Sequence, residues 1–262
     1  MRNALRQLAQ SLLILLSRPS ARRQRLRQAA VSTPFPKQWK ELLRDRCKHY
    51  RRLPSALQKR FRQQVQVFLS ERKVTGVEMR VTDETRLLVA ASAVSLSVGW
   101  LDYTWDQLAE VLLYPNNFDR DYNFGGTDFA GQAHPWGIVI MSVPALDRSF
   151  EETSQAYHVG FHEFAHLLDL TRTRFDGIPA GLGDDSIRRW LAIIEDEERR
   201  LRRGDSVLDP YALTGPVEFF PTAVEAFFQI PVKLAETHAE LYEFLSSYFA
   251  QDPASWDRAI RP

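Results

Sequence analysis

The residues best suited to chemistry lie in the segment His162-Glu163-Phe164-Ala165-His166. On a helix, His162 and His166 would lie one turn apart on the same face, because side chains at positions i and i+4 stack along the axis. Two imidazoles in this arrangement can bind one metal ion, and Glu163 can take a proton from a water molecule at that ion. The spacing is the His-Glu-x-x-His pattern of zinc-dependent hydrolases.

The neighbours of this motif are apolar, which predicts a helix that is buried on nearly every side. Buried imidazole and carboxylate groups lower stability unless they have partners. A metal ion is the simplest partner for all three groups, and the alternative is a pair of ordinary core or surface histidines. The apolar neighbours are Val159, Phe161, Phe164, Ala165, Leu167, Leu168 and Leu170.

A catalytic zinc ion usually has three protein ligands and one open position, so the chain must supply a third ligand. In the short-range pattern H-E-x-x-H-x-x-G-x-x-H, that ligand would stand at position 172, which is Arg172. An arginine does not bind zinc, which excludes this class. Asp169, three residues after His166, is interpreted as an alternative ligand facing the site, as a residue that holds a ligand histidine through its second ring nitrogen, or as a surface cap of the helix end.

Two later acids, Glu218 and Glu225, are candidates for the third ligand, because each is followed closely by a pair of phenylalanines. Carboxylates in apolar surroundings need partners, and residues seven apart on one helix point roughly the same way. The local sequence does not choose between them. His158, one turn before His162, is interpreted as a packing histidine, an alternative metal contact or a proton carrier.

The charge of the chain is unevenly distributed. Residues 1–62 hold 17 of the 34 lysines and arginines but only two acids, Glu41 and Asp45, although the net charge of the whole chain is +1. Such a basic segment either is a solvated tail or contacts nucleic acid, a membrane surface or an acidic partner. Cys47 is the only cysteine, which excludes an intrachain disulfide and a cysteine-based zinc site and fits a reducing compartment.

Residues 1–32 are predicted to form a basic helical arm, and residues 33–262 a single domain. Leucines at positions 5, 8, 12 and 15 follow helical spacing, and Pro19 interrupts the pattern. The apolar run at 12–16 is too short to cross a bilayer. Since no small-x-small cleavage site follows it, we expect a cytoplasmic protein rather than an exported one.

The hydrophobic pattern of residues 33–262 predicts an α+β domain, mostly helical, with a small mixed sheet beside the motif helix. Helices are expected at 39–50, 55–70, 87–98, 186–203 and over most of 221–248, and strands at 77–81, 111–115 and 136–142. Gly125, Gly126 and Gly131 lack G-x-G-x-x-G order and no Walker lysine follows them, which argues against a nucleotide site.

A series of landmarks occurs in a fixed order along the chain. They are Arg52-Leu53-Pro54, Leu112-Leu113-Tyr114-Pro115 with Phe118, the segment 135–142, the motif extended to Asp169, Asp176-Gly177, Tyr211-Ala212-Leu213-Thr214, Glu218-Phe219-Phe220, Leu241-Tyr242 and the segment 248–253. In these landmarks the chain resembles the Mlc titration factor family of zinc metallopeptidases, which is related to the catalytic domain of anthrax lethal factor.

This resemblance implies a zincin-like metallopeptidase domain with one Zn²⁺ per chain, bound by His162, His166 and Glu218. It implies that Glu163 is the general base and that Tyr211 points its hydroxyl into the site, where a phenol can stabilise a developing oxyanion. The same resemblance implies that Glu225 accepts a hydrogen bond from the ring nitrogen of a zinc-binding histidine that does not contact the metal.

The substrates implied by the resemblance are peptides, cleaved by an aminopeptidase or a short-peptide hydrolase. The strand expected at 138–142 would run beside the cleft, where a peptide could pair with it as an added strand. The family also implies a second role, in which the protein binds and sequesters a transcriptional repressor, with or without peptidase activity.

The chain departs from the family pattern after Glu218-Phe219-Phe220. The family usually continues with alanine, whereas this chain has Pro221. Proline inside a helix removes a hydrogen bond and clashes with the preceding turn. The helix that carries Glu218 is therefore expected to start late or to kink, and Glu225 remains its rival as the third ligand.

Overall fold

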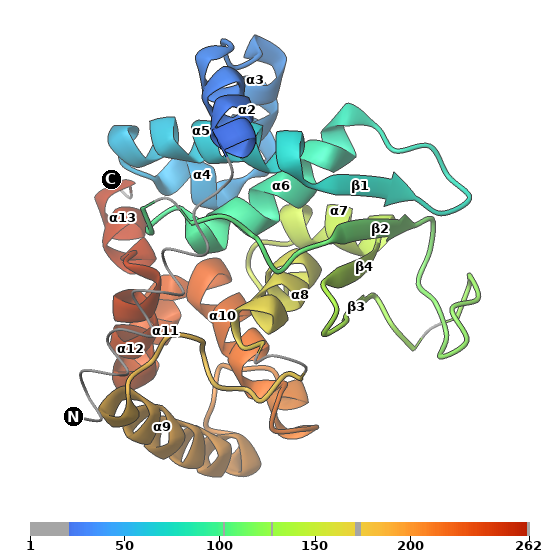
Figure 1. The fold of residues 1–262 in the computed structure, drawn as a ribbon. Coiled ribbons are helices and arrows are strands. Elements are labelled where there is room, and N and C mark those ends of the chain that lie inside the picture. Colours follow the sequence, from blue (N-terminus) through green and yellow to red (C-terminus); the bar gives the residue numbers. More distant parts are fainter. Residues whose placement is uncertain (1–20, 102, 127, 171–173, 261–262) are drawn as a thin grey trace, which may run out of the picture.

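The structure is a computed structural model that describes residues 21–101, 103–126, 128–170 and 174–260. One small sheet lies against a larger set of helices (Figure 1). The helices are α2 (Ala21–Ser32), α3 (Lys37–Arg46), α4 (Lys48–Arg52), α5 (Ser55–Glu71), α6 (Asp83–Ser97), α7 (Val143–Glu151), α8 (Val159–Leu168), α9 (Asp184–Arg203), the 3-10 helix η1 (Pro210–Leu213), α10 (Phe219–Gln229), α11 (Pro231–Thr237), α12 (Ala239–Phe249) and α13 (Pro253–Ile260).

The sheet has the strand order β1-β2-β4-β3. Its strands are β1 (Lys73–Gly76), β2 (Glu110–Tyr114), β3 (Gly131–Ala133) and β4 (Ile138–Ser142). β1, β2 and β4 are parallel, whereas β3 runs antiparallel to β4 and forms the edge. This small mixed sheet beside helix α8 confirms the predicted α+β architecture.

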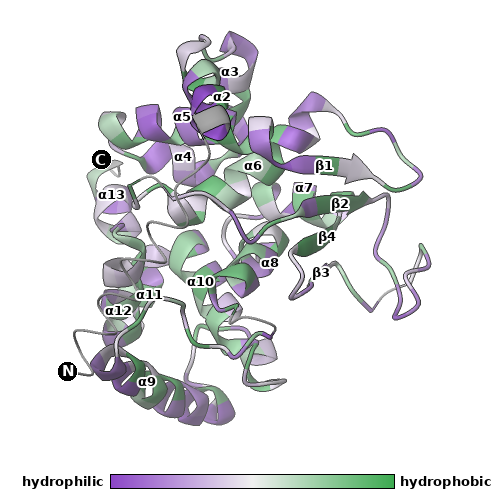
Figure 2. Ribbon diagram, in the orientation of Figure 1, coloured by the Kyte–Doolittle hydropathy of each residue, from purple (hydrophilic) through white to green (hydrophobic). Residues whose placement is uncertain are grey.

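Strand β4 is buried on both faces from Val139 onward, which explains its nearly continuous apolar sequence. In β4, Val139 and Met141 belong to the main core. On the other face, Ile140 packs with Tyr114 and Phe118 in a second, smaller core under the connection from β2 to β3. Figure 2 shows hydrophobic residues along β2, β4 and α10 and hydrophilic residues on α2.

Helix α8 lies at the centre of the fold and packs against β3, β4, α6, α7 and α10. Every residue of α8 except His162 is buried, which confirms the prediction of a helix enclosed on nearly every side. Small residues let α6 come close to it: a Cβ on Gly160 would lie 2.3 Å from Ser92 Oγ of α6. Helix α6 starts at Asp83, four residues before the predicted start at 87, and Thr82 caps it, because the Thr82 hydroxyl accepts the N–H of Thr85.

The prediction of a strand at 77–81 is wrong, because β1 ends at Gly76, one residue before the predicted range. The chain then folds back sharply, with Glu78 at φ 55°. A Cβ on Gly76 would lie 2.3 Å from Met79 O, so this glycine permits the tight return. Alternation at 77–81 arises because Val77 contacts the smaller core while Met79 contacts the main core.

The single helix predicted at 39–50 is two helices, α3 and α4. They are separated by Cys47, whose backbone is extended (φ −95°, ψ 96°) and which is itself buried. No helix among the described residues is both long and apolar enough to cross a membrane.

Helix α2 is the described part of the predicted arm, and it packs along α5. Residues 1–20, with the leucine pattern and Pro19, lie outside the described part of the chain. Arg23 and Arg27 both donate hydrogen bonds to the Glu71 carboxylate at the end of α5. Two of the basic charges of the arm are therefore engaged within the chain.

These contacts make the attachment of α2 depend on pH. Burial raises the pKa of Glu71, but the hydrogen bonds from Arg27 and Arg23 lower it by more than burial raises it. The pKa of Glu71 is therefore below its ordinary value. A carboxyl whose pKa is depressed in the folded state contributes stability at neutral pH, and this contribution is lost as the pH falls through the depressed pKa.

Glu71→Gln is expected to loosen α2, because it removes the charge from both arginine contacts at a cost of about 2 kcal/mol. Amide hydrogen exchange in α2, measured by mass spectrometry at neutral pH, should rise roughly 30-fold, with α8 unchanged. Glu41→Gln is the control, since its pair with Lys37 is exposed and 3.7 Å long. Equal exchange of α2 in the two variants would contradict this account.

Candidate active site

The two motif histidines lie on one face of α8 with their ring centroids 5.0 Å apart. Both direct Nε2 toward the carboxylate of Glu218, which is the N-cap residue of α10. Glu218 Oε2 lies 3.0 Å from His162 Nε2 and 3.5 Å from His166 Nε2. In the described part of the chain, these three residues form a group whose potential ligand atoms all lie within 4.8 Å of one another.

Pro221 does not disturb this arrangement, because the helix starts late, just after Glu218, which is one of the two outcomes expected from the sequence. Helix α10 starts at Phe219, so Pro221 stands in its first turn, where backbone N–H groups have no acceptor inside the helix. The missing N–H of proline therefore removes no helical hydrogen bond. The next residue, Thr222, donates its N–H to Glu218 O at 3.2 Å and continues the helix.

Glu225, the rival candidate for the third ligand, contacts the other nitrogen of the same ring. Its Oε2 lies 3.2 Å from His162 Nδ1, and its Oε1 accepts the backbone N–H of His158 at 2.7 Å. Glu218 and Glu225, two turns apart on α10, thus face opposite nitrogens of one imidazole. Glu225 lies behind His162 and outside the group of three potential ligands.

The chemistry of these side chains fits a divalent metal ion. If His162 donates from Nδ1 to Glu225, its Nε2 lone pair is free to bind a metal. Two imidazoles and one carboxylate are a donor set that catalytic zinc ions use.

The negative charges of the glutamates in this site also favour the binding of a cation. Burial lowers the pKa of His162, but the Glu225 and Glu218 carboxylates raise it to well above its ordinary value. Burial raises the pKa of Glu218, but hydrogen bonds to His162 and His166 bring it down to about 2.

Glu163 is 5 % exposed and lies on α8 beside these residues, facing β3. Burial is the main cause that raises its pKa to about 8. The negative charges of Glu218 and Glu225 add to this effect, while His162 and the Ala133 backbone amide oppose it. A carboxyl group in such surroundings exchanges protons near neutral pH, as general acid–base catalysis requires.

Strand β3 comes close to Glu163 because residue 131 has no side chain. A Cβ on Gly131 would lie 2.5 Å from Glu163 Oε1 and 2.7 Å from Val159 Cγ2. A larger residue would have to displace either the strand or the carboxylate. The sequence pattern around Gly131 was interpreted only with respect to a nucleotide site, although a glycine within a strand often marks a close backbone approach.

A cavity of about 290 Å³ opens over Glu163 and His162. Tyr211 of η1 lines this cavity, with its ring centroid 5.7 Å from that of His162 and about half of its surface exposed. Asp209, which the sequence analysis missed, accepts the N–H of Tyr211 at 2.8 Å and caps η1. An aspartate followed by proline at the start of a short helix is a recognisable capping signal.

Asp169 caps the end of α8 but bonds to no histidine ring among the described residues, which departs from its interpretation as a residue that holds a ligand histidine. Its Oδ2 accepts the N–H of Gly177 at 3.0 Å, and its Oδ1 has no hydrogen-bond partner in the described structure. Gly177 in turn lies against Pro216, because a Cβ there would come 2.3 Å from Pro216 O. Asp169 therefore fixes the turn on which the segment before Glu218 rests.

His158 also stays outside the ligand group. Its Nδ1 accepts the N–H of Phe161 and caps the start of α8. Its ring stacks on Phe161 with centroids 3.6 Å apart and meets Phe150 edge-on. Burial lowers the pKa of His158 to about 3, so the ring is neutral at physiological pH. Arg172, which excluded the short-range ligand pattern, lies outside the described residues.

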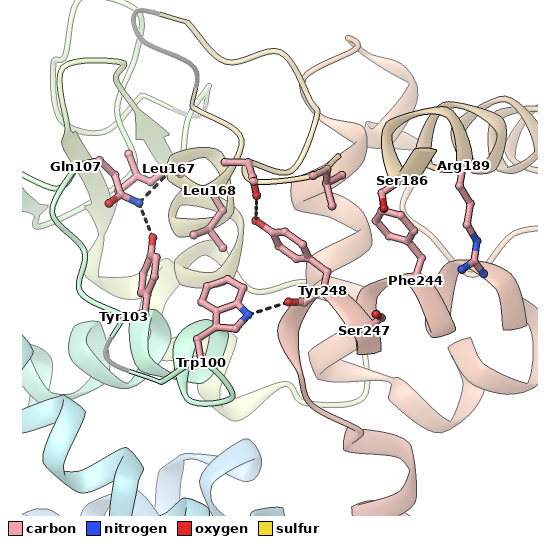
Figure 3. A pocket seen from close by; sticks show the side chains of 13 residues that line it. Trp100, Tyr103, Gln107, Leu167, Leu168, Ser186, Arg189, Phe244, Ser247 and Tyr248 are labelled. Carbon is pink, nitrogen blue, oxygen red and sulfur yellow. Dashed lines mark hydrogen bonds between the residues drawn. The ribbon is translucent and has the colours of Figure 1, made fainter. Parts of the chain in front are cut away.

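Two larger cavities occur elsewhere in the described structure. One, of about 520 Å³, lies at the end of α8 around Leu168, Tyr103 and Tyr248, and its lining has no histidine, aspartate or glutamate (Figure 3). The other, of about 740 Å³, lies beside α2 and includes Glu71 but no histidine. Neither cavity contains the candidate ligands, so the chemistry belongs to the smaller cavity over Glu163.

Comparison with known proteins agrees with this site. Residues 20–250 match the family model described as glucose-regulated metallo-peptidase M90. The chain belongs to this family. It is thus a metallopeptidase of the M90 family with a His-His-Glu group suited to bind a metal ion.

Several relatives of this M90 metallopeptidase share most of its length. An uncharacterized protein of Synechocystis sp. is 28% identical over 236 residues, which cover 84% of this chain and 86% of the relative. Mlc titration factor A of Edwardsiella ictaluri is 30% identical over 211 residues, 72% of this chain and 77% of the relative. Mlc titration factor A of Pectobacterium atrosepticum is 25% identical over 218 residues, 74% and 80% of the two chains.

Gly131→Ala is expected to lower peptide hydrolysis by about 100-fold, because the added methyl group displaces the Glu163 carboxylate. Metal content should not change, since the ligand atoms of His162, His166 and Glu218 lie elsewhere. Activity on a chromogenic peptide and the metal-to-protein ratio from atomic absorption check the two halves of this prediction.

Gly183→Ala serves as the matched control, because a Cβ at Gly183 would meet nothing within 4 Å and its φ of −81° suits alanine. Full activity of Gly131→Ala would contradict the prediction, because it would mean that the strand moves and the Glu163 carboxylate does not. Loss of metal together with activity would instead indicate a general distortion of the site.

Proposed function

We propose that this M90 metallopeptidase binds one zinc ion through His162, His166 and Glu218 and hydrolyses short peptides. The observation that carries the proposal is the convergence of two imidazole Nε2 atoms on one carboxylate oxygen. Glu163 lies next to that point, at the wall of the cavity over the site. When bound, zinc supplies a Lewis acid that polarises the scissile carbonyl and makes water a better nucleophile.

The side chains around the cavity have distinct roles in this proposal. Glu163 accepts the proton of the attacking water and hands it to the departing amine. The Tyr211 hydroxyl donates a hydrogen bond to the oxygen on which negative charge develops. Glu225 holds the His162 ring through Nδ1, so that Nε2 keeps its lone pair and its direction.

The substrate backbone is proposed to pair with β3. The strand expected to do so from the sequence was β4, but β4 lies between β2 and β3 and has no free edge. In the ladder between β3 and β4, Ser142 N donates to Ala130 O and His134 N donates to Ile138 O. Because antiparallel ladders alternate, Gly131 and Ala133 direct their backbone groups away from β4, where the Ala133 N–H contacts Glu163 and the remaining groups face the free side.

Aminopeptidase activity is the narrower proposal from the family resemblance. Asp128 and Asp209 line the same cavity as Glu163. Their carboxylates suit the free α-ammonium group of a peptide, because charge-assisted hydrogen bonds to an ammonium are strong. Peptides with a free amino terminus are therefore the preferred test substrates.

Glu163→Gln is expected to keep about one zinc per chain and to lose peptide hydrolysis by about 10³-fold, because glutamine is isosteric but cannot take a proton. The measurements are zinc content by mass spectrometry and hydrolysis of chromogenic peptides with free and acetylated amino termini. A variant that keeps its activity would refute Glu163 as the base.

Binding of a transcriptional repressor is the second candidate function, because two of the relatives are named Mlc titration factor A. The same variant separates the two roles. If purified wild type hydrolyses no peptide, yet it and Glu163→Gln both release a purified Mlc repressor from its operator DNA, binding is the better description.

For the third ligand, Glu218→Ala is expected to lower zinc affinity at least 100-fold, because it removes a ligand atom. Glu225→Ala should lower it about 10-fold to 100-fold, as for other partners behind a metal-binding histidine. Competition with a zinc chelator at fixed pH measures both affinities. The reverse order would exchange the roles of the two glutamates.

A further inference from the structure

Four aromatic side chains among the described residues are exposed: Tyr122, Trp136, Tyr157 and Tyr211. Tyr157 and Tyr211 line the cavity over Glu163. The other two belong to segments at the ends of β3, the strand that borders this cavity. Trp136 is 67% exposed, although it is one of the largest apolar side chains of the protein.

Stacked rings hold Trp136 in position. It stacks on His134, with centroids 4.7 Å apart and planes at 13°. His134 Nε2 lies 3.4 Å from the Tyr122 hydroxyl, and Tyr122 stacks on Phe118, which is fully buried. These four residues, Phe118, Tyr122, His134 and Trp136, form an aromatic column that runs from the smaller core to the surface.

The turn that carries Trp136 is fixed by its backbone. Gly137 N donates to His134 O at 2.9 Å, and His134 N donates to Ile138 O at 2.8 Å, which closes a tight connection between β3 and β4. Gly137 has φ 86° and packs against the backbone of Gln107, since a Cβ there would come 2.1 Å from Gln107 O. The exposed indole is thus held by its stacking on His134 and by a turn that packs against Gln107.

The column lies within reach of a peptide bound at the active site. Ala133, whose amide contacts Glu163, is three residues before Trp136, a span of at most about 10 Å. A peptide paired with β3 advances about 3.3 Å per residue. A substrate residue two or three positions from the scissile bond would therefore lie beside Trp136.

The face of the strand is also suitable. The Cβ direction of Gly131 points at Glu163 of α8, so His134, three residues later, faces the opposite side of the sheet. An extended peptide alternates its side chains in the same way. Every second substrate side chain thus points toward the rings of the aromatic column.

We infer that the aromatic column is a subsite for a large apolar or aromatic side chain of the peptide, two or three residues from the scissile bond. This inference rests on the proposed peptidase function. The indole and imidazole faces offer a flat, apolar surface that is already ordered, so the protein side chains lose little additional conformational entropy when a substrate ring stacks there.

The test compares peptides that carry phenylalanine or serine at each of four positions on either side of the cleaved bond. At one position, two or three residues away, phenylalanine should raise kcat/KM of the wild type about tenfold, mainly through KM. Trp136→Ala should lower kcat/KM about tenfold for that phenylalanine peptide and no more than about twofold for its serine counterpart.

Leu26→Ala is the matched control, since Leu26 is a large exposed apolar residue on α2, 54% exposed, and should change neither value. Equal losses on both peptides, or no preference in the wild type, would overturn the subsite but not the peptidase proposal.

If the wild type hydrolyses no peptide, the peptidase proposal fails, and the subsite is tested by measuring peptide binding instead. Fluorescence anisotropy then compares the labelled phenylalanine and serine peptides on Glu163→Gln and on Glu163→Gln with Trp136→Ala. Tighter binding of the phenylalanine peptide, abolished by Trp136→Ala, would support the subsite independently of catalysis. Equal binding of the two peptides would overturn it.

Discussion

The site depends on one contact between α8 and α10, in which a carboxylate from α10 lies against each ring nitrogen of His162 on α8. Glu218 lies 3.0 Å from Nε2 and Glu225 lies 3.2 Å from Nδ1. Seven residues separate the two acids, so a regular helix brings both to the same face and the imidazole fits between them. A kink in α10 would break this match. The helix stays regular because Pro221 stands in its first turn, where no backbone hydrogen bond is lost.

Apolar packing brings the two helices together, since the polar groups of the site would not do so alone. Every residue of α10 from Phe219 to Gln229 is buried, and the phenylalanines that follow each glutamate belong to the main core. Buried carboxylates lower stability unless a cation and hydrogen bonds compensate them. The core therefore provides the free energy that holds this charged site closed, and a divalent cation is the partner that suits its charge.

Much of this could be predicted from the sequence, because both helices carry strong periodic patterns. The burial of α8, the partnership with a later glutamate and the small mixed sheet all follow from hydrophobic spacing and from the motif. The strand at 77–81 was misplaced because alternation arises equally in a loop that touches two cores, and only the positive φ of Glu78 separates the two cases. For Asp169 the interpretation as a helix cap agrees with the structure, but its contact with the amide of Gly177 was missed, because side-chain patterns do not report a backbone partner.

The edge strand shows best what sequence patterns leave out. β3 has only three residues, too few for a periodic signal, yet its first residue, Gly131, lines the cavity over Glu163. Its contact with Glu163 exists because Gly131 lacks a Cβ, so the strand proposed to hold the peptide touches the carboxylate proposed to act on it. The same three residues lead directly into the turn that carries Trp136. A shift of β3 would therefore move the base contact and the aromatic column together, which couples substrate binding to the position of Glu163 through a single short segment of backbone.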